Sequence, residues 1–200
     1  MLLDVSSAAL SIRGDAGGAG SVLSGGGSGP MVSLRTFGSR LTVEDLEMTG
    51  AMACFGSVIT AADMAEPCDR EAGPLDTSII LRRAHLHDNA YEVGGGVVGV
   101  TGGSVVLEDT LIADNQGHAV FSVGADVSCS GSPSIQAGMM RNSKSGVWLS
   151  SAGAETGYAL ISQSCDWGEN GQEDVRLGGE TSFDGFGEDA TFTCDGRSET

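Results

Sequence analysis

The residues best suited to chemistry in this chain are two histidines and a set of charged side chains at matching places in a repeated pattern. Asp45, Arg83 and Asp109 follow equivalent apolar residues, and His85 and His87 come shortly after Arg83 on one side of an alternating segment. Carboxylates beside a guanidinium and two imidazoles could supply acid, base and electrostatic stabilisation to an acidic sugar. These five residues form the candidate catalytic patch.

A structural interpretation explains more of the same pattern. Glu44, Arg82 and Glu108 stand one position earlier than the patch residues and repeat the order acid, base, acid. Equivalent residues of stacked strands lie within about 5 Å of one another, where opposite charges attract. Catalysis would leave Arg82 without a role. We therefore expect each arginine to lie between the carboxylates of two neighbouring repeats, and we expect no catalysis.

Two further groups could bind a metal ion. His85 and His87 would present two imidazoles on one face, but the sequence places no third ligand near them. The loop "DWGENGQED" offers Asp166, Glu169 and Asp174, although it lacks the final bidentate glutamate of an EF-hand loop. We expect a solvated acidic turn and no cofactor, with calcium at these three carboxylates as the alternative.

The overall charge and composition restrict the class of protein. Ten basic and 27 acidic residues give a net charge of −17, which opposes binding to nucleic acid or to anionic membrane surfaces. The 32 glycines and the aromatic content of 5% indicate short strands and tight turns. No apolar run approaches the roughly 18 residues of a membrane helix. The first residues lack the basic and apolar regions of a signal peptide, and none is predicted in this chain.

An internal repeat is the strongest signal in the sequence. The pattern is apolar, two variable residues, apolar, one variable residue, apolar, followed by a turn rich in Asn, Asp, Ser and Gly. The first apolar position of the five copies is occupied by Val43, Leu81, Leu107, Ile135 and Ile161. The third is occupied by Met48, Leu86, Ile112, Met140 and Asp166. Such repeats indicate a solenoid, in which each unit buries its apolar face against its neighbours.

The alternation and the glycine content exclude helical repeats, so we predict an all-β fold, a parallel β-helix. Residues 1–179 would form the repeats, with an irregular insertion at about 52–77. Residues 180–200 differ in composition, and we predict that they form a C-terminal cap over the open end of the solenoid.

The stretches "LTVEDLEMTG", "HDNAYEVGGGVVGV" and "ADNQGHAVFSV" resemble bacterial secreted right-handed parallel β-helix proteins of the pectate-lyase-like superfamily. The polymorphic outer-membrane-protein type is the nearest, through the signature residues Asn89, Ala90, Gly94, Gly95 and Gly96. The resemblance covers roughly residues 8–179 and implies a right-handed solenoid. It says little about activity, since this scaffold carries lyases, hydrolases, epimerases, adhesins and inert stalks.

The five cysteines form no CxxC pair, which excludes zinc ribbons and thioredoxin-type motifs. Cys54 and Cys68 bracket one irregular stretch, and Cys165 and Cys194 bracket the C-terminal stretch. We predict these two disulfides and a free Cys129, which fits an extracellular or cell-surface location. Five buried thiols in a cytosolic protein are the alternative.

These features together predict a secreted or surface-exposed structural or adhesive module that displays loops on a rigid shaft. Its partners would be surface glycans or proteins of a host or cell surface, with neither nucleic acid nor membrane insertion. The alternative is a carbohydrate-active enzyme, a lyase or epimerase of uronate polymers. A chain of charge −17 repels such a substrate unless calcium or a local basic patch intervenes.

Overall fold

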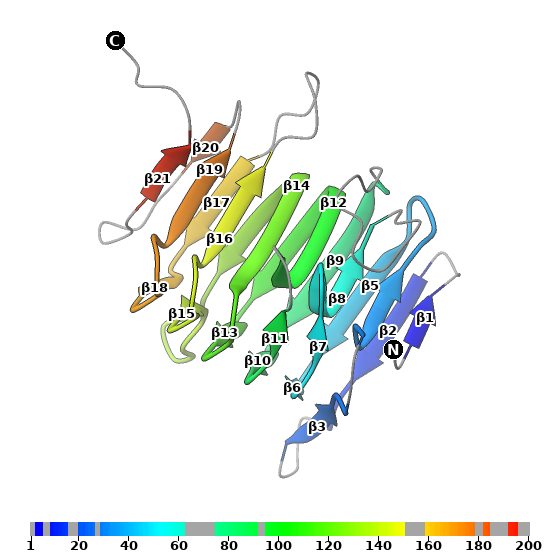
Figure 1. Cartoon of the computed structure of the whole chain (residues 1–200). Helices are drawn as coiled ribbons and strands as arrows, with labels where there is room; N and C mark the ends of the chain where they lie inside the picture. Colours follow the sequence, from blue (N-terminus) through cyan, green and yellow to red (C-terminus); the bar gives the residue numbers. More distant parts are fainter. Residues whose placement is uncertain are drawn as a thin grey trace.

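The computed structural model describes residues 3–5, 9–15, 20–26, 29–62, 75–91, 95–150, 159–178, 182–184 and 192–195. The described part of the chain is all-β, and its strands lie side by side in chain order from one end of the molecule to the other (Figure 1). A search of these residues for helices long and apolar enough to cross a membrane finds none.

The strands form three sheets, and all their pairings are parallel. The two smaller sheets hold six strands, β3 (Ser21–Ser24), β6 (Leu46–Thr49), β10 (His85–His87), β13 (Leu111–Ala113), β15 (Gly138–Met140) and β18 (Asp166–Gly168), and two strands, β7 (Met52–Ala53) and β11 (Ala90–Tyr91). The 13-stranded sheet contains β1 (Leu3–Val5), β2 (Ala9–Arg13), β4 (Val32–Leu34), β5 (Arg40–Glu44), β8 (Gly56–Ala61), β9 (Thr77–Arg82), β12 (Gly96–Glu108), β14 (His118–Ser130), β16 (Val147–Ser150), β17 (Ala159–Gln163), β19 (Val175–Gly178), β20 (Ser182–Asp184) and β21 (Phe192–Asp195).

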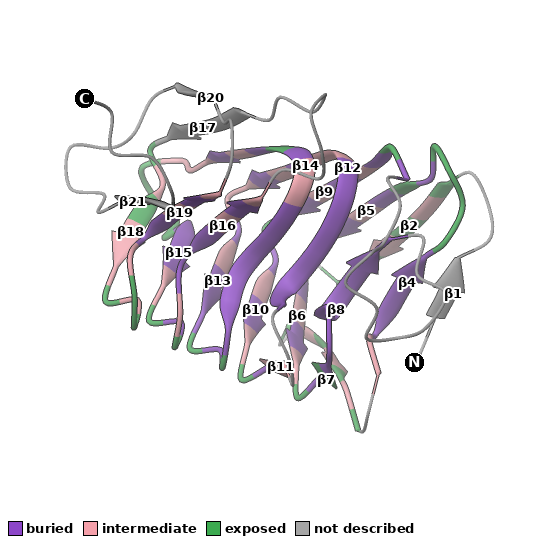
Figure 2. Ribbon diagram, turned by 45° about the horizontal axis from the view of Figure 1, so that its top comes forward, coloured by how far each residue is buried: buried purple, intermediate pink, exposed green. Residues whose placement is uncertain are grey.

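Alternating burial explains why the repeats form strands. In β9 every second residue is buried. Figure 2 shows that buried residues recur on the neighbouring strands along the stack. The predicted first row is confirmed for Val43, Leu81 and Leu107, which are direct partners in β5, β9 and β12 and are fully buried. Stacking of equivalent apolar residues therefore builds the core of this part of the chain.

The prediction of this first row is wrong for its last two members, Ile135 and Ile161. Leu107 pairs with Cys129, and Cys129 pairs with Ser162. Ile135 lies outside the strands with 41% of its surface exposed, and Ile161 pairs with Ser128. The physical cause for Ile135 is the connection between β14 and β15, residues 131–137, which is longer than its counterparts in the preceding repeats, whereas Ile161 lies one residue before the row position at Ser162.

The prediction of the third row is also wrong for its last two members, each by one residue. Met48, Leu86 and Ile112 pair with one another as predicted and are fully buried. The row continues with Met139 and Trp167 in place of the predicted Met140 and Asp166. A one-residue slip moves a side chain to the other face of the strand, so Met140 is only half-buried and Asp166 is exposed.

Between the sheets, the chain turns at residues with positive φ. Arg83 (φ 48°) follows β9 and stands in register with Asp45 (φ 54°) and Asp109 (φ 51°). A second series has Asp114 (φ 58°) and Arg141 (φ 53°) at the ends of β13 and β15. Asp tolerates this region of φ better than most residues, whereas a long arginine rarely occupies it. The turns thus place charged side chains in columns along the stack.

Directly after the second series of turns lies a ladder of asparagines. Asn89, Asn115 and Asn142 are buried, and Asn170 continues the row. Each Oδ1 accepts the backbone N–H of the equivalent residue in the preceding repeat, at 3.0 Å for both Asn89 to Ala51 and Asn115 to Asn89. The Nδ2 groups of Asn89, Asn115 and Asn142 each donate to the main-chain carbonyl two residues earlier, at the end of the preceding strand. The asparagines therefore satisfy the backbone of every second turn.

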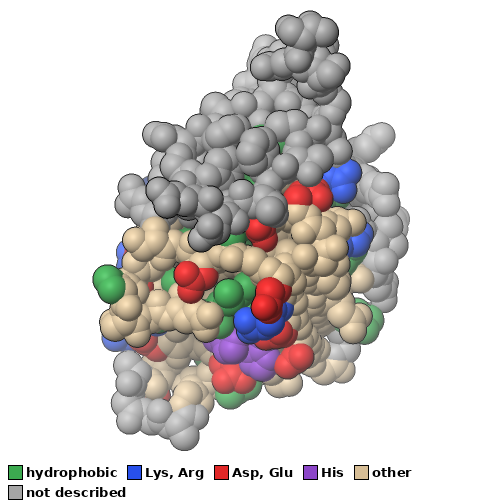
Figure 3. All heavy atoms as spheres, turned by 90° about the vertical axis from the view of Figure 1, so that its left-hand side faces the viewer, with side chains coloured by type: hydrophobic (Ala, Val, Ile, Leu, Met, Phe, Trp, Pro, Cys, Tyr) green, Lys and Arg blue, Asp and Glu red, His purple; other side chains and the backbone are tan. Residues whose placement is uncertain are grey.

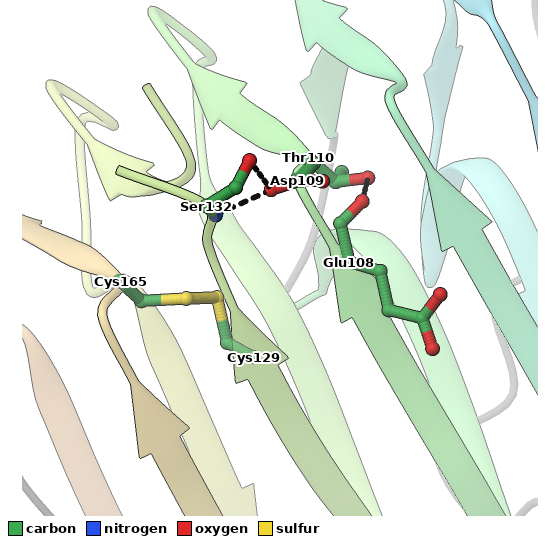
Figure 4. Close-up of a disulfide and its surroundings, with 6 residues drawn as sticks. All are labelled: Glu108, Asp109, Thr110, Cys129, Ser132 and Cys165. Atoms are coloured by element: carbon green, nitrogen blue, oxygen red, sulfur yellow. Dashed lines mark hydrogen bonds between the residues drawn. A yellow bond between two sulfur atoms is a disulfide. The ribbon is translucent and has the colours of Figure 1, made fainter. Parts of the chain in front are cut away.

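The disulfide pattern corrects the sequence prediction. Cys129 is bonded to Cys165, with 6.1 Å between their Cα atoms (Figure 4), so Cys129 is not free and Cys165 is not paired with Cys194. Cys129 takes the row position next to Leu107, at the end of β14, and is therefore close to the turn of the next repeat. Cys54 is also disulfide-bonded, while Cys68 lies outside the described residues.

The predicted irregular insertion and the predicted C-terminal cap both contain regular strands. The 52–77 insertion includes β7 and β8, and β8 pairs in parallel with β4 and β12. In the segment 180–200, β20 pairs with β17, and β21 pairs with β19. The described parts of both segments therefore continue the sheets, and the cap remains a prediction.

Candidate functional site

The predicted patch lies where the 13-stranded sheet turns into the six-stranded one. Arg83 donates two hydrogen bonds to Asp45, from Nε to Oδ1 at 2.6 Å and from Nη2 to Oδ2 at 3.0 Å. Arg13 adds a longer contact to Asp45 at 3.6 Å. The hydrogen bond from Arg83 lowers the pKa of Asp45, and the same bond raises the pKa of Arg83. Asp45 is therefore an anion held in a two-point ion pair.

Asp109 does not complete the predicted column. Its Oδ1 accepts hydrogen bonds from Ser132, from the backbone N at 2.5 Å and from Oγ at 2.7 Å (Figure 4). These two bonds lower the pKa of Asp109, with only a smaller contribution from the charge of Arg83. The long 131–137 connection carries Ser132 to Asp109. The prediction that Arg83 lies at salt-bridge distance from two carboxylates is therefore wrong for Asp109.

The neighbouring column behaves as predicted. Arg82 contacts Glu44 at 3.1 Å and Glu108 at 2.5 Å, on β5 and β12, the strands on either side of its own. The hydrogen bond that Arg82 donates to Glu108, and then the one that it donates to Glu44, raise the pKa of Arg82. The acid–base–acid order therefore links three adjacent strands through one guanidinium.

The two histidines lie together on β10, with ring centroids 4.4 Å apart. Figure 3 shows the imidazoles gathered with acidic and basic side chains on one part of the surface. His87 is bonded to Glu47 at 2.9 Å through Nε2 and to Asp88 at 2.8 Å through Nδ1. His85 is half-buried, and its Nε2 has no hydrogen-bond partner among the described residues.

Their surroundings shift the pKa values of the two imidazoles in opposite directions. Burial and the neighbouring His87 lower the pKa of His85. Burial also acts to lower the pKa of His87, but its hydrogen bonds to Asp88 and Glu47 outweigh burial and raise it. The pair therefore holds one readily protonated imidazole beside one that resists protonation.

A second ion pair, which was not predicted from the sequence, lies beside the histidines. Arg141 donates to Asp114 from Nε and Nη2, both at 2.8 Å. Each residue precedes a ladder asparagine, in the motifs "DN" and "RN", so the repeat itself contained the signal. Among the described residues, Asp45, Arg83, Asp109 and His87 are all engaged by such partners, which leaves little of the predicted patch for a substrate.

A search of the described residues finds no three His, Cys, Asp or Glu side chains that converge on one point. Of the calcium candidates, Asp166 and Glu169 are exposed. Asp174 is 5% exposed and accepts a hydrogen bond from Asn170 Nδ2 at 2.8 Å. The three carboxylates therefore do not assemble into one site.

His87→Gln should destabilise the protein most in mildly acidic solution. The raised pKa of His87 means that its stabilising effect is fully present below the unfolded value of about 6.5 and disappears as the pH rises through the folded pKa. The lowered pKa of His85 has the opposite effect, because protonation of His85 as the pH falls favours the unfolded state. Urea unfolding at pH 5.5 and 8.5 checks this, and an equal loss at both pH values would contradict it.

Comparison of the chain with protein-family models, with curated proteins and with solved structures finds no match. The arrangement of the described side chains is therefore the basis of any functional assignment.

Proposed function

We propose that the chain winds as a right-handed parallel β-helix solenoid. Parallel pairing of strands in chain order supports this winding, as does the way that the chain passes from the large sheet to the small one in each repeat. The inward rows and the asparagine ladder are the features that such a winding requires in each coil.

We infer further that the module is secreted or surface-exposed and has a structural or adhesive role, displaying its turns and loops to surface glycans or proteins. The observation that carries this proposal is that Arg82 and Arg83 both bind carboxylates of neighbouring strands. Charged groups used in this way fix register rather than act on a substrate. The disulfide between Cys129 and Cys165 favours an oxidising compartment.

Arg83→Ala is the test of this assignment. The variant should lose a small amount of stability, because Asp45 loses its two-point partner, and the loss should shrink in high salt, where exposed charges are screened. Arg35→Ala is the matched control, since among the described residues its guanidinium forms no ion pair and donates a hydrogen bond to Ser33 in its own repeat. Urea unfolding at low and high salt measures the difference.

The same two proteins, wild type and Arg83→Ala, should be incubated with polyuronates in the presence of calcium. We expect no turnover by either protein. Turnover by the wild type that is lost in Arg83→Ala would overturn the structural role and restore a lyase or epimerase. Beads coated with the wild-type chain should adhere to glycan-bearing surfaces, and their failure to adhere would remove the adhesive role.

A further inference from the structure

A polar pocket lies on the large sheet, away from the histidines and the ion pairs. Its volume is about 340 Å³, within the range of about 300–1,000 Å³ that is typical of small-ligand sites. Its walls come from three neighbouring strands and the turns that lead into them. The lining residues are Gly38, Arg40, Asp76, Thr77, Ser78, Gly103 and Ser104.

Backbone hydrogen bonds hold these walls in place. Gly38 N donates to Leu75 O at 2.9 Å, and Leu75 N donates to Thr101 O at 2.9 Å, so one chain of bonds crosses all three repeats. Gly103 has a φ of 83°, and a Cβ at this position would lie 1.9 Å from Thr77 O. Only glycine allows this close approach of β12 to β9. The pocket is therefore preformed, which lowers the entropic cost of binding.

The polar groups of the pocket are unpaired, in contrast to those of the ion-pair columns. Arg40 and Asp76 are exposed, and neither has an ion pair or a side-chain hydrogen bond within the described part of the chain. The charged groups of Arg40 and Asp76 are therefore available to a ligand in the pocket.

An aromatic side chain adjoins the pocket in the sequence. Phe37 directly precedes the lining residue Gly38, and 71% of its surface is exposed. It is the most exposed large hydrophobic residue in the described part of the chain. Because Phe37 adjoins a lining residue in the chain, its exposed ring is available to the apolar face of a ligand that extends past Gly38.

We propose that this pocket binds a neutral saccharide unit. A sugar ring offers vicinal hydroxyls to the donors of Arg40 and the acceptors of Asp76, with Ser78 and Ser104 as further partners. Its C–H face can lie against a phenyl ring such as that of Phe37. Arg40 and Asp76 carry opposite charges, so the lining has no excess of positive charge to attract an anion, and the whole chain carries −17.

The inference rests on the adhesive function proposed above and specifies its ligand. An array of neutral and acidic oligosaccharides, probed with the wild-type chain, should show binding to neutral members. Asp76→Asn and Arg40→Gln should weaken that binding about tenfold or more, since each removes charge-assisted hydrogen bonds. Asn tolerates the positive φ of Asp76 (47°), so the fold should survive. Phe37→Ala should weaken binding as well.

Asp88→Asn is the matched control, because Asp88 is also an aspartate with positive φ (52°) but pairs with His87 outside the pocket. It should bind as the wild type does. Three results would each contradict the proposed saccharide site: no neutral member is bound, acidic members are preferred, or Asp88→Asn weakens binding as much as Asp76→Asn.

Adhesion of coated beads distinguishes the saccharide site from the adhesive function. If Asp76→Asn beads adhere as well as wild-type beads, the pocket is not the adhesive site and the adhesive function stands. If wild-type beads do not adhere while soluble sugars bind, the adhesive function fails and the pocket stands.

Discussion

Asn115→Ala should lower the free energy of unfolding by about 3–4 kcal/mol, a larger effect than that of removing any of the surface ion pairs. Asn115 Oδ1 accepts hydrogen bonds from the backbone N and Nδ2 of Asn89 at 3.0 and 3.1 Å. Its Nδ2 donates to Ala113 O at 2.8 Å and to Leu86 O at 3.0 Å. Alanine would leave the buried backbone N–H of Asn89 without this acceptor and would remove a donor from Ala113 O and from Leu86 O. Each buried polar group left unsatisfied costs about 1–3 kcal/mol.

Gln116→Ala is the control for this prediction. Gln116 is the next residue, is exposed, and contributes main-chain hydrogen bonds to the turn, with no side-chain hydrogen bond to the residues that the structure describes. Urea unfolding followed by circular dichroism should therefore show a change within about 0.5 kcal/mol for this variant. If Asn115→Ala were no more destabilising than Gln116→Ala, the ladder would not be a source of stability and the packed rows alone would hold the repeats together.

The rows of the core were predictable as long as the repeats kept one internal length. The first and third apolar positions are five residues apart in Val43–Met48 and in Leu107–Ile112, so a fixed template aligned them correctly. From Cys129 to Met139 the interval is ten, because the 131–137 connection adds residues outside the strands. A template of constant length passed over this change and selected Ile135, an exposed residue, instead of a buried cysteine.

The candidate site was predictable where strand register alone decides the contact. Arg82 lies in β9 and meets the carboxylates of its direct neighbours, so its partners follow from the row alignment. Asp109 finds its donor in Ser132, on a loop whose path no strand pattern specifies. The neutral-saccharide pocket was equally beyond a linear pattern, since its walls come from three repeats and depend on the positive φ of Gly103.

The role of the asparagines could be predicted from the sequence only in part. Asn89, Asn115 and Asn142 were visible in the sequence as turn residues at intervals of 26 and 27. Asparagine favours turns through its own local hydrogen bonds, and this local preference was enough to explain the pattern. Their larger contribution is to the neighbouring repeat, at 2.9 Å from Asn115 Nδ2 to Asn142 Oδ1. It becomes apparent only when the repeats are stacked.

Removing the disulfide between Cys129 and Cys165 should cost about 4 kcal/mol. The bond closes a segment of 36 residues, and the loss of chain entropy in the unfolded state on closing a loop of that length corresponds to this value. The segment includes the long 131–137 connection and β15 and β16, so the bond also fixes the repeat in which the row spacing changes. The double variant Cys129→Ala, Cys165→Ala tests the prediction by urea unfolding.

Dithiothreitol supplies the control, because the wild type also contains a disulfide at Cys54. The loss that the reductant causes in the wild type, minus the loss that it causes in the double variant, isolates the bond at Cys129. Reduced wild type keeps both sulfur atoms in place, so this difference excludes the cavity that alanine leaves at the buried Cys129. Peptide mapping without reduction should recover Cys129 joined to Cys165. Recovery of Cys165 joined to Cys194, with Cys129 as a free thiol, would overturn this pairing, and the double variant would then reveal only the effect of the cavity.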